Sequence, residues 1–207
     1  MIIHIEICYV KNTGRCKELL VPGTVVYINK SDNPSRSIKY DLIAVEKVTK
    51  KCNLLINMDS YASNIAFGEY LQQDKFLDNV TYIKSEAKYG TSRFDFCVET
   101  SLNKAFIEVK GVTLEENGIA MFPDAPTERG IKHLNESAAC MADGYAAYVV
   151  FVIQMEGIAH FTPNYKTHAA FCETLAKVME LGIRAIAFDC RVTHGGITIN
   201  KPIPIKL

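Results

Sequence analysis

The chain has 207 residues, of which 48% are hydrophobic and 22% are charged, so it can bury one large core or two smaller ones, and its composition excludes the disordered and fibrous classes. With 23 basic and 23 acidic residues its formal net charge is zero, which sets it apart from the strongly basic nucleic-acid-binding proteins. Its seven cysteines include no Cys-x-x-Cys pair, which argues against a zinc site or a disulfide framework, so we expect a reducing, cytoplasmic location.

The first 75 residues alternate short β segments with turn residues. Turns are predicted at residues 12–14, 22–23 and 32–34, where Asn, Gly, Asp and Pro occur. Strands are predicted over residues 2–10, 24–29, 39–48 and 53–57. This pattern favours a small β-barrel, and the helical spacing over residues 59–71 predicts a helix that joins this first domain, residues 1–75, to the rest of the chain.

Residues 76–207 combine longer strands with helices, which predicts a mixed α/β domain. The segment 146–154 is apolar on both faces, as a central strand covered by helices must be. Its apolar run is far shorter than a membrane span and the chain starts without a basic leader, so we expect neither an anchor nor an export signal. Further strands are predicted over 94–98, 105–112, 184–191 and 197–203, the last at a sheet edge because of Pro202 and Pro204, and helices over 126–142 and 165–181.

The hairpin over residues 93–112 carries the chemically most informative side chains. If residues 100–103 form its loop, Glu99 pairs with Lys104, and the same register places Asp95 directly opposite Glu108. Like charges at such cross-strand positions repel each other and destabilise a sheet. Two carboxylates held together in an otherwise apolar hairpin therefore indicate a function.

A divalent cation such as Mg²⁺ or Mn²⁺ would account for this acid pair, because carboxylates, water and phosphate oxygens are its usual ligands. Lys110 lies two residues beyond Glu108 on the same face and could orient an attacking water or offset charge that develops on phosphorus. These residue types are typical of phosphodiester hydrolysis. The alternative interpretation of a Glu-x-Lys pattern on a strand is a solvated face with a weak ion pair.

Three segments resemble one known family in sequence and in order: EAKYGTSRFDF at residues 86–96, FIEVKGVTL at 106–114 and MFPDAPTERGIKHL at 121–134. Together with the turn motifs at 12–14, 22–23 and 31–36, the resemblance covers nearly the whole chain and identifies it as similar to the sugar fermentation stimulation protein A family. The resemblance implies a small N-terminal OB-like β-barrel followed by a restriction-nuclease-like α/β core, and DNA binding. The chain starts close to the motif at 12–14, so we expect the barrel to be incomplete.

The resemblance also implies roles for individual residues. Asp95 and Glu108 would be metal ligands, Lys110 the catalytic lysine, and Glu86 a further acid that binds or orients the metal. Tyr89, Ser92 and Arg93 lie in the same motif and could contact phosphate. For Tyr89 and Ser92 the alternative is a purely structural role in a turn or at a strand edge.

The helix over 126–142 carries a group of cationic side chains away from its apolar stripe. We predict that Arg129 and His133 face the site and hold phosphate, with Lys132 on the same polar side; an exposed, solvated helix face is the alternative.

Three functions remain in competition. The first is a Mg²⁺- or Mn²⁺-dependent nuclease that acts on DNA, with RNA as an alternative substrate. The second is a non-catalytic DNA-binding regulator that keeps the nuclease-like core as a scaffold. The third, a small-molecule-binding protein of sugar metabolism, has no supporting motif.

Overall fold

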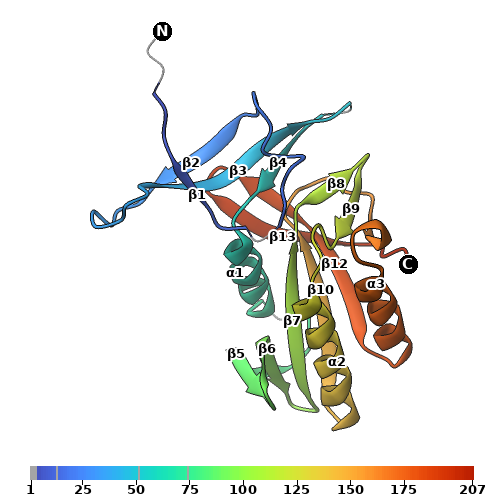
Figure 1. Cartoon of the computed structure of the whole chain (residues 1–207). Helices are drawn as coiled ribbons and strands as arrows, with labels where there is room; N and C mark the ends of the chain where they lie inside the picture. The colour runs from blue at the N-terminus through green and yellow to red at the C-terminus, as the bar shows by residue number, and fades with distance from the viewer. Residues whose placement is uncertain (1–3, 13, 51, 74) are drawn as a thin grey trace.

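The computed structural model describes residues 4–12, 14–50, 52–73 and 75–207. Figure 1 shows an N-terminal sheet that sits at one end of a larger sheet, with helices on both sides of the latter. No helix in the described parts of the chain is long and apolar enough to cross a membrane.

The N-terminal sheet is built around one long strand. β3 (Tyr40–Val48) pairs with β1 (Cys8–Val10) in parallel and with β2 (Val26–Lys30) and β4 (Asn53–Asn57) in antiparallel orientation. Of the strand predicted over residues 2–10, only β1 forms, and residues 1–3 lie outside the described residues. Within the described ranges the strands form an open sheet and not a closed barrel.

The second sheet has six strands in the order β13-β12-β10-β7-β6-β5. Its centre, β10 (Ala146–Ile153), pairs in parallel with both neighbours and is buried on both faces, which confirms the prediction for this segment. Among the described residues β13 pairs only with β12, so it is an edge strand, as its prolines predicted. The remaining strands are β5 (Val80–Tyr89), β6 (Ser92–Thr100), β7 (Lys104–Val112), β12 (Arg184–Thr193) and β13 (Gly196–Ile203).

All three predicted helices form. α1 (Ser60–Leu71) covers one face of the six-stranded sheet, and α2 (Glu128–Ala142) and α3 (Tyr165–Glu180) cover the other (Figure 1). Their first turns are fixed by short polar side chains: Asp59 accepts a hydrogen bond from the Tyr61 N–H at 2.9 Å, and Thr127 accepts one from the Gly130 N–H at 3.0 Å. α2 therefore begins after Pro126 and its cap, two residues later than predicted.

The packing of α1 bears on how the chain is divided. Its buried residues Ala66, Phe67 and Leu71 belong to the apolar cluster beneath the six-stranded sheet. The predicted boundary at residue 75 therefore separates α1 from the sheet that it covers. The N-terminal sheet and the six-stranded sheet also share a core. An ion pair joins the N-terminal sheet to the segment that follows β7, with Lys47 Nζ 2.7 Å from an oxygen of the buried Glu115 carboxylate.

A third, small sheet was not predicted. It consists of β8 (Leu114–Glu116), β9 (Ile119–Phe122) and β11 (His160–Pro163). The turn between β8 and β9 is Asn117-Gly118, with φ of 54° and 84°. Asn-Gly is the preferred dipeptide for a two-residue hairpin in which both residues have positive φ, so the sequence did contain a signal for it.

Gly111 stands at the place where α1, β7 and the end of β10 meet. A Cβ atom there would lie 2.4 Å from Gln154 Oε1 and 3.1 Å from Ser63 Oγ. Gln154 cannot move away freely, because its Nε2 donates to Asn57 O, Asn57 Oδ1 and Asp59 O at 2.9–3.1 Å.

We therefore expect Gly111→Ala to lower the free energy of unfolding by about 1–3 kcal/mol through overpacking. Urea midpoints of the two proteins at equal slope would measure the loss. Gly195→Ala is the matched control, since a Cβ at Gly195 meets no atom within 4 Å. Equal midpoints for both variants would contradict the packing argument.

Candidate active site

The β6–β7 hairpin positions the two acids, Asp95 and Glu108. Its ladder runs from Glu99↔Lys104 to Phe96↔Ile107, which confirms the predicted register over those four pairs. Asp95 and Glu108 occupy the next positions on the two strands. There the ladder stops, because the Asp95 side chain, in place of a backbone carbonyl, accepts the Val109 N–H at 2.7 Å.

Asp95 lies between this hairpin and α1. Its Oδ2 takes the Val109 N–H, and its Oδ1 accepts a hydrogen bond from Asn64 Nδ2 at 2.7 Å. Burial and the nearby Glu108 charge raise the pKa of Asp95 to about 6, although the Val109 N–H, Lys110 and Asn64 each act to lower it. The ionised form of Asp95 is therefore destabilised in the absence of another cation.

Glu108 faces α2 and is buried beside two nitrogen donors. Lys110 Nζ lies 2.6 Å from Glu108 Oε1, and His133 Nδ1 contacts the same oxygen. Burial alone would raise the pKa of Glu108, but the His133 and Lys110 contacts outweigh it, so its pKa is lowered. Among the described residues the second oxygen, Oε2, has no hydrogen-bond partner.

His133 links Glu108 to an arginine. Arg129 Nε donates to His133 Nε2 at 3.3 Å, so the imidazole must carry its proton on Nδ1, toward Glu108. The same contact uses the Arg129 Nε–H and leaves both of its Nη groups for the pocket that Arg129 lines.

These side chains line a solvent-open pocket of about 290 Å³. β7 supplies Glu108 and Lys110, β6 supplies Asp95, and the start of α2 supplies Arg129. The pocket has room for water and for part of a phosphodiester beside the carboxylates. The Asp95 carboxylate and the second oxygen of Glu108, Oε2, are hard ligands that fit a divalent cation of the Mg²⁺ class, which completes its coordination with water and substrate oxygens.

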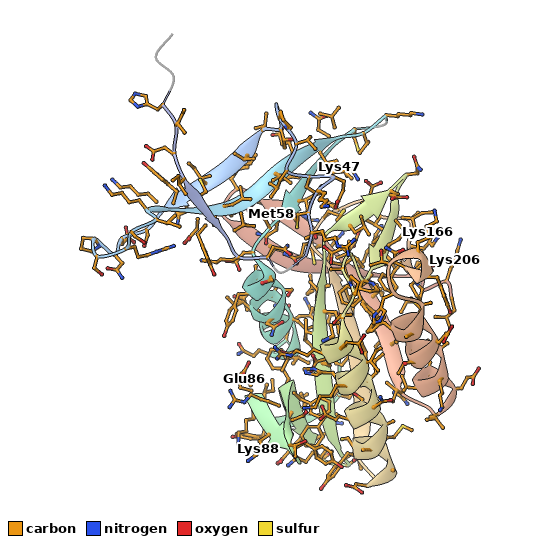
Figure 2. The ribbon with its side chains drawn as sticks, in the orientation of Figure 1. Lys47, Met58, Glu86, Lys88, Lys166 and Lys206 are labelled. Atoms are coloured by element: carbon orange, nitrogen blue, oxygen red, sulfur yellow. The ribbon has the colours of Figure 1, made fainter. Side chains whose placement is uncertain are left out.

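Glu86 does not join this group. Its backbone has a positive φ of 53°, its carboxylate is exposed, and Arg93 Nη1 lies 3.2 Å from it. Figure 2 shows Glu86 on the outer strand β5, on the side of the molecule opposite Lys166. Within the described ranges no three His, Cys, Asp or Glu side chains cluster closely enough to hold a metal, so a three-acid ligand set that includes Glu86 is not assembled.

The other predicted contact residues divide into exposed and buried groups. Arg93 and Lys132 are exposed, and Lys132 lies 3.7 Å from Glu136. Tyr89 contacts Asp143 and packs against Phe106, and Ser92 is buried, which agrees with a structural role for both. His133 is also buried; it was expected to face the site and hold phosphate, and it does face Glu108, but its two ring nitrogens are already engaged by Glu108 and Arg129.

Two participants were missed. Asn64 reaches Asp95 from α1, and no feature of the sequence pattern distinguishes it from an ordinary helix residue. Asp124 lines the pocket and accepts the Arg15 N–H at 3.1 Å, while a Cβ at Gly14 would lie 1.9 Å from its Oδ2. Only a glycine at position 14 fits against the Asp124 side chain in this arrangement. The close approach of these two residues therefore accounts for Gly14.

Comparison with known proteins agrees with this architecture. The profile of the sugar fermentation stimulation protein RE domain matches residues 61–196, and that of the SfsA N-terminal OB domain matches residues 2–54. Sugar fermentation stimulation protein homologues from Ruminiclostridium cellulolyticum and Clostridium beijerinckii are each 52% identical over 98% of this chain and 88% of their own length.

A solved structure, described as Pyrococcus furiosus SfsA in complex with Ca²⁺, superposes with a TM-score of 0.87 at 27% identity and covers 99% of this chain and 87% of its own. The two profiles together cover most of the chain up to the start of β13, and the relatives align over almost the full length. The chain belongs to the sugar fermentation stimulation protein (SfsA) family.

Proposed function

We propose that this protein is a Mg²⁺- or Mn²⁺-dependent nuclease that hydrolyses phosphodiester bonds of DNA, with RNA as the alternative substrate. The observation that carries the proposal is the pair formed by the partly buried Asp95 and the buried Glu108, with Lys110 beside it, at the wall of a solvent-open pocket. Such a pair of acids is unfavourable to fold unless a cation or a proton offsets one charge.

The donor set and the relatives support a divalent cation. Asp95 and Glu108 would hold it through oxygens, and the Pyrococcus furiosus relative is described as a complex with Ca²⁺, a cation that also prefers oxygen ligands. When bound, such a cation supplies Lewis-acid activation of a phosphodiester and of the attacking water.

The protein's own residues have separable tasks. The Lys110 ammonium group contacts Glu108 and has further N–H groups that a substrate could use. Lys110 would orient the nucleophile and donate a hydrogen bond to the phosphoryl oxygens. Arg129 would clamp a phosphate with its two Nη groups, because its Nε is already fixed by His133. His133 acts as a positioning residue that holds Glu108 in place.

One observation favours the second candidate, a non-catalytic DNA-binding scaffold. Lys110 and His133 already contact Glu108, so this acid is compensated without any metal. Of the two acids, only Asp95 has a raised pKa. A change in stability on adding metal that depends on Asp95 therefore separates the two candidates.

The direct experiment incubates the purified protein with end-labelled single- and double-stranded DNA and RNA in Mg²⁺, Mn²⁺, Ca²⁺ or chelator. We expect cleavage in Mg²⁺ or Mn²⁺, none in chelator, and none by Glu108→Gln, which keeps the shape of the side chain but removes its charge. Cleavage that persists in chelator, or in Glu108→Gln, would overturn the proposal.

Arg129→Ala should weaken nucleic-acid affinity and reduce the steepness of its salt dependence. Loss of one phosphate contact lowers the slope of log K against log salt by about 0.7–0.9. The slope would be measured by titrating labelled DNA at several salt concentrations in chelator. Lys166→Ala, at an exposed cation on α3 that does not line the pocket, is the control; equal slopes for the two variants would favour a solvated role for Arg129.

A further inference from the structure

A second groove lies next to the candidate active site. It has a volume of about 560 Å³ and runs between β1 and the beginning of α1. Its rim carries Tyr9, 51% exposed, Tyr61, 66% exposed, and Ile65, 56% exposed. Three large apolar side chains exposed around one hollow are unusual enough to indicate a ligand.

The two tyrosine rings are free to stack on a ligand. Among the residues that the structure describes, neither ring contacts another aromatic ring or makes a hydrogen bond through its hydroxyl. The groove itself is firmly built, because the Ser60 N–H and hydroxyl both bond to Lys11 O, at 2.9 and 2.7 Å. The two segments that carry the rings are therefore held in fixed positions.

The floor of the groove is polar but its charges are matched. Lys11 Nζ lies 3.2 Å from an Asp41 oxygen and 3.6 Å from an Asp59 oxygen, so its positive charge is already compensated by two carboxylates. A phosphate would meet those carboxylates. An uncharged, flat, aromatic group fits the apolar rim and the neutral floor better.

The groove continues into the candidate active site. Asn12 and Ser60 line both the 560 Å³ groove and the 290 Å³ pocket that holds Asp95, Glu108 and Lys110. A polymer that placed one of its units in the groove would therefore have its neighbouring units at the acid pair. A nucleic-acid strand has this form, with aromatic bases joined by phosphodiesters.

We infer that the groove binds a nucleobase of an unpaired strand between Tyr9 and Tyr61, and that the protein's substrate is single-stranded nucleic acid or a duplex with a single-stranded end. In a duplex the base faces are stacked on one another and are not available to the tyrosines, whereas an unpaired base offers both faces. The path of the strand from the groove to the acid pair rests on the proposed nuclease function. The binding of a base in the groove needs no catalysis.

Affinity measured in chelator tests the groove without cleavage. A fluorescein-labelled thymidylate of roughly 12 nucleotides, and a blunt duplex of similar length, would be titrated by fluorescence anisotropy. For Tyr9→Leu and for Tyr61→Leu we expect the Kd for the single strand to rise about 10-fold, with an unchanged salt slope and an unchanged Kd for the duplex. Tyr9→Phe and Tyr61→Phe keep the ring and should bind like the parent.

Tyr82→Leu is the matched control, because Tyr82 is 53% exposed on β5 and lines neither the groove nor the active-site pocket. It should bind the single strand as the parent does. Equal urea midpoints would show that each Leu variant is folded. An unchanged Kd in both Leu variants, or an equal loss of duplex binding, would overturn the inference, and so would a parent that does not bind the single strand.

A photo-crosslink locates the base directly. Thymidylate carrying one 4-thiothymidine would be irradiated with the full-length parent in chelator, and the adducts mapped by mass spectrometry. Adducts at Tyr9 or Tyr61 support the groove; adducts confined to other regions exclude it. Binding that depends on the tyrosines in a protein that cleaves nothing would keep this inference and reject the nuclease, and tyrosine-independent cleavage would do the reverse.

Discussion

Lys110→Met is expected to lower kcat for metal-dependent cleavage by about 10²- to 10⁴-fold, the range found when a residue that stabilises the transition state or transfers a proton is removed. Methionine keeps much of the length and the apolar stem of lysine, so the pocket should keep its shape. Lys110 Nζ lies 2.6 Å from Glu108 and has no other described partner, which frees it to follow the substrate.

Metal affinity should behave differently from the rate. Removing a cation from beside two carboxylates does not weaken their attraction for a divalent ion, so the metal Kd should stay the same or tighten. Lys104→Met is the matched control, because Lys104 lies on the same strand and the same face but pairs with Glu99 at the surface. Full cleavage by Lys110→Met, or an equal loss in Lys104→Met, would remove Lys110 from the mechanism.

Local sequence patterns predicted much of the fold. The period of two in β6 and β7, with the loop at residues 100–103, gave the register of the hairpin, and β10 was recognised because it is apolar on both faces. The helices were predicted to within two residues at either end from the spacing of their apolar residues, from Pro126 at the start of α2 and from Gly182 after the end of α3. These features depend on neighbours in sequence, which a single chain displays.

The pattern did not predict contacts between distant segments. Asn64 reaches Asp95 across 31 positions and His133 reaches Glu108 across 25, and neither pairing has any periodic signal. Glu86 illustrates the opposite error. A regular strand would have turned its carboxylate toward the face of Asp95, but its positive φ, a conformation that non-glycine residues seldom adopt, turns it toward Arg93 and solvent.

The acid pair should make the metal-free protein less stable than its Asp95→Asn variant. The folded protein holds the Asp95 proton more tightly than an unfolded chain, where the pKa is near 3.8, because burial and Glu108 raise the pKa to about 6. The stability that this proton contributes is present below pH 3.8 and is lost as the pH rises through about 6. At pH 7 the variant should therefore be the more stable by up to roughly 3 kcal/mol.

The substitution removes charge with little change of shape or hydrogen bonding. The new amide can still accept the Val109 N–H through Oδ1, and a half-turn of the Asn64 amide would present an acceptor to the new Nδ2. Asp78→Asn, at an exposed acid without a described partner, controls for a general effect of charge.

Metal should offset most of this difference in stability. Mn²⁺ at about 100 times its Kd stabilises a protein that binds it only when folded by roughly 2.7 kcal/mol, and Asp95→Asn should gain much less. Urea midpoints in chelator and in Mn²⁺, at pH 4 and pH 7 and at equal slopes, would measure both effects. A parent that is the more stable without metal at pH 7, combined with no response of either protein to Mn²⁺, would mean that Asp95 and Glu108 form no metal site. Lys110 and His133 can compensate the charge of Glu108 without a metal, so the DNA-binding scaffold would then be the better account of this core.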